Sequence, residues 1–160
     1  MEKNEEIIDV LNDLIQINND RVTGYERAAS EIQNSEYAEI TSLFFKMTED
    51  SRTYKNDLID AVISLGGEPA TDTTMSGKIY RMWMDLKVSF SGNDLRAVLE
   101  SCEFGEDAAL RAYQDALQTE LSWPQDLLTL VSNQRQEIRT SHDRIKRYRD
   151  EFRNVEDLKT

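Results

Sequence analysis

The chain has 160 residues, of which 39% are hydrophobic and 31% are charged, and its formal net charge is −12. This length is most simply a single domain, 1–160, that is large enough to bury a substantial core. The negative charge argues against binding to nucleic acid, which requires clustered Lys and Arg, and no apolar run approaches the roughly 18–20 residues of a membrane span. The acidic opening MEKNEEIIDV lacks the apolar core of a signal peptide, so we expect a cytoplasmic protein.

The first half of the chain predicts two long helices. A helix over about 4–33 is predicted by two heptad rows, Ile8, Ile15, Val22, Ala29 and Leu11, Asn18, Tyr25, Ile32, which mark its inner face. A break at Asn34-Ser35 is followed by a second helix, predicted over 36–65. This helix should end at Gly66-Gly67, where glycine can adopt the left-handed conformation of a C-terminal cap.

The second half predicts two more long helices, over 94–120 and 124–153, after a crossover at 66–93. Within the crossover, KIYRMWMDLKVSF (78–90) has the spacing of a short helix. The links between the first two helices and between the last two are short, whereas the crossover is long enough to run the length of a bundle. One such long connection is typical of the ferritin-like arrangement. The sequence therefore predicts an all-α, antiparallel, ferritin-like four-helix bundle.

A carboxylate interrupts the apolar face of the third predicted helix. Leu99, Cys102, Glu106, Ala109 and Tyr113 follow one another at helical spacing, which places Glu106 among hydrophobic residues. A buried carboxylate needs a metal, a cation or a proton of its own.

Other polar residues fall at a similar level of the four helices. They are Glu26 in the first helix, Glu49 and Arg52 in the second, Glu103 and Glu106 in the third, and Arg139 and His142 in the fourth. Antiparallel pairing brings all of them within one or two turns of the middle of the bundle, so we expect one interior polar cluster.

The cluster resembles a di-iron carboxylate site that has lost ligands. Such sites take a glutamate from each of two helices and a Glu-x-x-His pair from each of the other two. Here the corresponding pairs read Glu49-x-x-Arg52 and Arg139-x-x-His142, and arginine cannot bind a metal because its guanidinium has no lone pair.

Charge counting favours a metal-free network at these positions. At the candidate ligand positions, Glu26, Glu49 and Glu106 give −3. Arg52 and Arg139 give +2, which leaves about −1 with a neutral His142, so the guanidinium groups already supply most of the neutralisation. We therefore expect no cofactor. The alternative is an iron or manganese site on Glu26, Glu49, Glu106 and His142. No catalytic residue is assigned, since Cys102 lies on an apolar face and no serine stands in a glycine-rich elbow.

Several stretches resemble an uncharacterised bacterial family of ferritin-like four-helix bundles, known chiefly as a domain of unknown function. The stretches that carry the resemblance are LNDLIQ…GYERAA, LGGEP, YRMWMDLK, CEFGEDAALRAY and SHDRIKRYRD. The resemblance covers about residues 5–150 and implies a ferritin-like fold in a cytoplasmic bacterial protein. It also implies metal-ligand positions at Glu26, Glu49, Glu106 and His142, from which Arg52 and Arg139 depart.

Three functional hypotheses follow. The first is a non-catalytic structural or interaction protein with a buried Glu/Arg/His network. The second is an iron- or manganese-binding protein with an oxidoreductase or stress-related role, and the third is a binder of small anions at Arg52 and Arg139. Whether the protein is an enzyme stays open at this point. The crossover residues Tyr80 and Trp83 suggest a surface for a homodimer or for a protein partner that the sequence does not identify.

Overall fold

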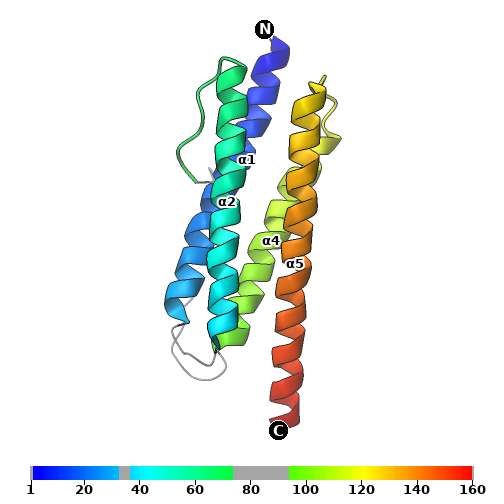
Figure 1. Cartoon of the computed structure of the whole chain (residues 1–160). Coiled ribbons are helices and arrows are strands. Elements are labelled where there is room, and N and C mark those ends of the chain that lie inside the picture. Colours follow the sequence, from blue (N-terminus) through cyan, green and yellow to red (C-terminus); the bar gives the residue numbers. More distant parts are fainter. Residues whose placement is uncertain (1, 33–36, 74–93, 160) are drawn as a thin grey trace.

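The computed structural model describes residues 2–32, 37–73 and 94–159, which form four long helices (Figure 1). Their bounds are α1 Glu2–Glu31, α2 Ala38–Ser64, α4 Asp94–Gln118 and α5 Gln125–Lys159. They lie within a few residues of the predicted ranges, except that α5 continues beyond the predicted end at 153. The short helix predicted on the crossover, at 78–90, lies outside the described residues.

The direction of the helices requires the long connection. In Figure 1 the C-terminal end of α2 and the N-terminal end of α4 lie at opposite ends of the bundle. The chain between them must therefore travel the length of the molecule. α1 packs along α2 and α4 along α5, and the two pairs meet mainly through α1 and α4. This is the predicted ferritin-like connectivity.

The start of the crossover is fixed by a glycine turn. Gly66 has a φ of 84°, and the amide of Gly67 donates to the carbonyl of Val62 at 3.0 Å, so α2 ends in the predicted left-handed cap. Gly67 packs against α1, because a Cβ at this position would lie 2.8 Å from Cγ2 of Ile8. The chain thus turns directly onto α1.

Side-chain amides of α1 then hold the returning chain. Asn12 donates to the carbonyl of Glu68 at 3.1 Å and accepts from the amide of Ala70 at 2.8 Å. One and two turns further along α1, Gln16 and Asn19 donate to Asp72 at 2.9 and 2.8 Å. The bonds of Asn12 and Asn19 supply partners for backbone groups outside the helices, whereas Gln16 binds the side-chain carboxylate of Asp72.

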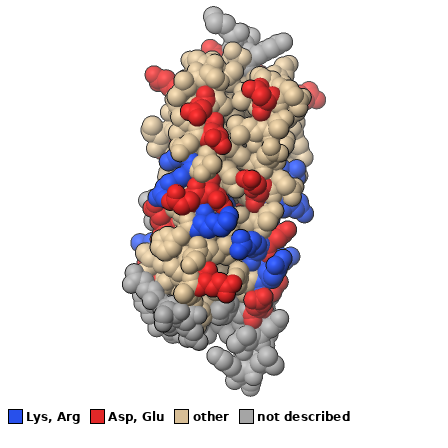
Figure 2. Space-filling model, in the orientation of Figure 1, with Lys and Arg blue, Asp and Glu red and all other residues tan. Residues whose placement is uncertain are grey.

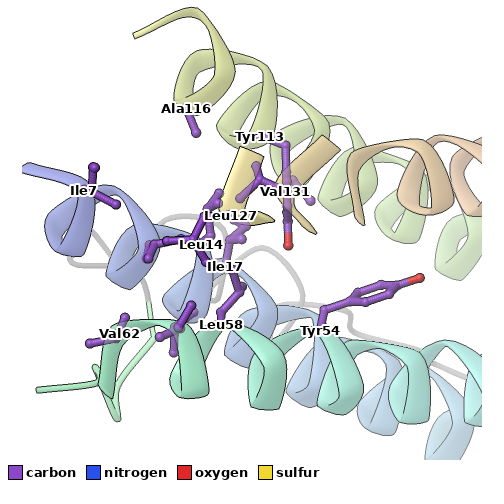
Figure 3. Close-up of a cluster of buried hydrophobic side chains, with 14 of the residues drawn as sticks. Ile7, Leu14, Ile17, Tyr54, Leu58, Val62, Tyr113, Ala116, Leu127 and Val131 are labelled. Carbon is purple, nitrogen blue, oxygen red and sulfur yellow. The ribbon is translucent and has the colours of Figure 1, made fainter. Parts of the chain in front are cut away.

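The core consists of two apolar clusters, one toward each end of the bundle. The first includes Leu11, Leu14, Leu58 and Val131 (Figure 3), and the second includes Phe44, Met47, Leu99 and Ile145. All eight of these side chains are at most 4% exposed. The two clusters are separated at mid-length by buried polar side chains of all four helices.

The surface is strongly charged. Figure 2 shows acidic and basic side chains interspersed on one face, with the basic ones concentrated in the half away from the N-terminus. No helix within the described residues is long and apolar enough to cross a membrane.

We expect Asn12→Ala to lower the free energy of unfolding by about 1 kcal/mol, because two hydrogen bonds to the crossover backbone are lost. Asn133→Ala, at an exposed position of α5, should change it by less than about 0.5 kcal/mol. Urea denaturation of both variants measures the difference. Equal effects would mean that Asn12 does not hold the crossover.

Candidate functional site

A buried ion pair joins α1 to α4 at the centre of the bundle. Nη2 of Arg21 lies 2.6 Å from Oε1 of Glu106, and both side chains are fully buried. The hydroxyl of Tyr25 donates to the same carboxylate oxygen. Burial alone would lower the pKa of Arg21, but the adjacent Glu106 carboxylate raises it above its ordinary value. The guanidinium is therefore held in its charged form inside the core.

Two aromatic rings enclose this guanidinium. Cζ of Arg21 lies 5.7 Å from the ring centroid of Tyr25 and 5.8 Å from that of Tyr54. Cations at this distance are attracted to the electron-rich face of an aromatic ring, and the attraction increases when water is excluded. The rings therefore offset part of the cost of removing Arg21 from water.

A second set of hydrogen bonds connects all four helices beside the ion pair. Asn18 of α1 donates to the hydroxyl of Tyr113 of α4 at 2.8 Å, and this hydroxyl donates to Oε1 of Gln134 of α5 at 2.6 Å. Nε2 of Gln134 then donates to the backbone carbonyl of Tyr54 of α2 at 3.2 Å. The polar layer, as we name it, comprises Asn18, Arg21, Tyr25, Tyr54, Glu106, Tyr113 and Gln134.

The polar layer does not fit a di-metal centre. Glu106 is its single carboxylate, whereas such a centre needs several. Its Oε2 atom has no hydrogen-bond partner among the described residues, and the same holds for Nε and Nη1 of Arg21. A metal ion bound at that oxygen would therefore lie beside an unshielded guanidinium, and the two cations would repel each other.

The residues predicted as metal ligands lie in three separate surroundings. Glu26 and Glu49 both pair with Arg52 on the exposed side of α1 and α2. Glu106 is in the polar layer, with Arg21 as its partner rather than Arg52 or Arg139, and Arg139 is exposed on α5. His142 lies on the side of α5 that faces Asp107 of α4.

Sequence reasoning missed Arg21 and Gln134, although their spacing could have revealed both. Arg21 lies three residues after Asn18 and four before Tyr25, two positions that were already on the predicted inner face. Gln134 likewise lies three residues after Val131 and four before Ile138. Neither was predicted, because the heptad rows of the first helix pass beside position 21 and the predicted inner face of the last helix went from Val131 directly to Ile138.

A second group of ionisable side chains lies between α4 and α5, away from the polar layer. Among the described side chains, Glu103, Asp107 and His142 are the one group of three whose potential metal-binding atoms lie within 4.8 Å of one another. Nε2 of His142 is 2.6 Å from Oδ1 of Asp107, and Nδ1 is 3.2 Å from Oδ1 of Asp143. Glu103, the third member of the group, forms an ion pair with Arg149. Of the predicted ligands, this group contains only His142.

Solved structures define the class of this bundle. A Dps1 mutant from Mycobacterium smegmatis matches 92% of this chain and 97% of its own, with a TM-score of 0.77 and 15% identity. The dodecameric thioferritin of Bacteroides fragilis, a bacterioferritin-related protein, matches 97% and 90%, with a TM-score of 0.77 and 16% identity. A DPS protein from Vibrio cholerae O1, described as a ferritin-like diiron-carboxylate protein, has a TM-score of 0.72 and 17% identity over 92% and 91%. The fold is therefore that of the ferritin-like four-helix bundles.

The family follows from a sequence comparison. Residues 6–119 match the model of the family described as Domain of unknown function (DUF2383), and the chain belongs to this family. A comparison with curated proteins gave no match.

Arg21→Met should lower the free energy of unfolding by about 3–5 kcal/mol, because it leaves the buried Glu106 carboxylate without its cation. Arg52→Met is the matched control, since Arg52 pairs with exposed carboxylates and should contribute less than about 1 kcal/mol. Urea denaturation measures both. Similar losses in the two variants would contradict the central position of Arg21.

The buried tyrosines should make the protein sensitive to alkali. Burial raises the pKa values of Tyr25, Tyr54 and Tyr113 above the ordinary value. The unfolded chain therefore loses these protons above about pH 10 while the folded chain retains them. Their contribution to stability is complete below that pH and decreases as the pH rises.

Denaturation measured on either side of about pH 10 tests this dependence. Tyr25→Phe, which has no phenolic proton to lose, should show a smaller decrease than the wild-type protein. An identical decrease in the two proteins would contradict the prediction.

Proposed function

We propose that this protein is a non-catalytic ferritin-like bundle with a structural or interaction role, in which the polar layer takes the place of a di-metal centre. The observation that carries the proposal is the fully buried pair of Arg21 and Glu106. The Arg21 guanidinium supplies the positive charge that a metal ion would otherwise bring to the Glu106 carboxylate. The pair is neutral as a whole and needs no additional cation. The proposal retains the cytoplasmic location expected from the sequence.

The polar layer would serve to fix one packing of the helices. Apolar side chains alone tolerate several registers, whereas a buried polar group has to meet its own partner. Here the chain from Asn18 through Tyr113 to Gln134 links three helices and reaches the backbone of the fourth. A one-turn slip of any helix would break these bonds, so the layer favours a single arrangement.

The alternative is an iron or manganese protein with an oxidoreductase or stress-related role. The Vibrio cholerae DPS protein is described as belonging to a superfamily of diiron-carboxylate proteins, which gives this alternative its support. The positions of Glu26 and Glu49 weigh against it, since both carboxylates are exposed and share Arg52.

The metal content of variants distinguishes the metal-free structural role from the metal-binding alternative. We expect wild-type protein and Glu106→Gln to retain equal Fe(II) or Mn(II) per chain after anaerobic incubation and desalting, as measured by elemental analysis. Glu106→Gln should be less stable, because Arg21 then lacks its anion. Glu49→Gln is the surface control and should match wild type in both properties. Loss of metal in Glu106→Gln would overturn the proposal and favour the interior site.

Self-association is part of the proposed role. The Bacteroides fragilis relative is dodecameric, which supports an assembly of identical chains, and the sequence suggests a homodimer. Light scattering should give a mass of at least two chains. A single-chain mass throughout the micromolar range would contradict self-association and direct the search to other partners.

A further inference from the structure

We propose that Glu103, Asp107 and His142 form a mononuclear site for a divalent transition-metal ion on the α4–α5 face. This site lies apart from the polar layer and from the interior positions predicted from the sequence, and it adds a binding activity to the structural role proposed above.

The helices bring three suitable ligands to one point. Glu103 and Asp107 are four residues apart on α4 and therefore project from the same face, one above the other. His142 approaches them from α5, and one ligand atom of each residue lies within 4.8 Å of the others. Ligands at about 2.0–2.2 Å from one ion lie up to roughly 4 Å apart, so small side-chain movements suffice to bind it.

The histidine is oriented in the way that a metal ligand requires. Asp143 lies 3.2 Å from Nδ1, where it can accept that proton, and this leaves Nε2 directed at Asp107, 2.6 Å away. A carboxylate on the far nitrogen of a ligating histidine fixes the ring and raises the basicity of the nitrogen that binds. The ion would enter between Nε2 of His142 and Oδ1 of Asp107.

Charge and exposure are also suitable. Glu103, Asp107 and Asp143 contribute three negative charges, and the one cation that contacts Glu103, Arg149, also pairs with Asp150, so an excess of negative charge remains that favours binding of a cation. His142 and Glu103 are 17% and 13% exposed, whereas Asp107 is 54% exposed. The ion would therefore be bound at the rim, where water can complete its coordination.

The ligand set selects the class of metal. One imidazole nitrogen with two carboxylate oxygens suits Zn(II), Fe(II) or Mn(II), whereas Ca(II) and Mg(II) prefer oxygen ligands alone. Zn(II) should bind more tightly than Mn(II) at such a site, following the general order of divalent affinities.

Titration of chelator-treated protein with Zn(II) tests the proposal by calorimetry. We expect one ion per wild-type chain, with binding weakened at least about tenfold in His142→Ala and in Asp107→Asn. Glu100→Gln, one turn before Glu103 on the same helix, is the matched control and should bind like wild type. Circular dichroism checks that all variants are folded.

A fourth variant should move the affinity in the opposite direction. Arg149→Met removes the cation that contacts Glu103, so it should tighten Zn(II) binding, an effect that misfolding would not produce. Absence of binding in wild type, or equal binding in wild type, His142→Ala and Asp107→Asn, would overturn the site. Glu106→Gln distinguishes the two proposals. Absence of binding in the wild type contradicts this site alone, whereas loss of metal in Glu106→Gln contradicts the metal-free interior.

Discussion

The arrangement of the core depends on the ion pair between Arg21 and Glu106. Two unit charges removed from water cost several kcal/mol each unless they meet partners of good geometry. Here the carboxylate accepts hydrogen bonds from the guanidinium and from the Tyr25 hydroxyl, and the guanidinium also lies within cation–π distance of two tyrosine rings. Because the two buried charges neutralise each other only in this arrangement, the pair specifies how α1 meets α4.

The rest of the bundle is built around this layer. The apolar clusters on either side exclude water from it, which strengthens its electrostatic interactions and makes any unpaired group costly. The long crossover lets α4 run antiparallel to α1 (Figure 1).

The sequence predicted the fold well, because helix periodicity and the Gly66-Gly67 cap are local signals. It also identified Glu106 as a buried carboxylate from its neighbours alone. It did not identify the partner, since the choice among Arg21, Arg52 and Arg139 depends on the rotation of each helix about its own axis. A small rotation separates a buried arginine from an exposed one, and only the packing of all four helices determines it. The same reason explains why His142 faces Asp107 on the α4–α5 face and not Glu106.

The most direct test of the account is a double-mutant cycle between Arg21 and Glu106, with Arg21→Met, Glu106→Gln and the double variant followed by urea denaturation. The account predicts that the double variant is more stable than the sum of the single losses implies, by at least about 2 kcal/mol. The corresponding cycle of Arg52 with Glu26 should give a coupling near zero, because that pair is exposed. Additive losses at Arg21 and Glu106, within about 0.5 kcal/mol, would contradict the account.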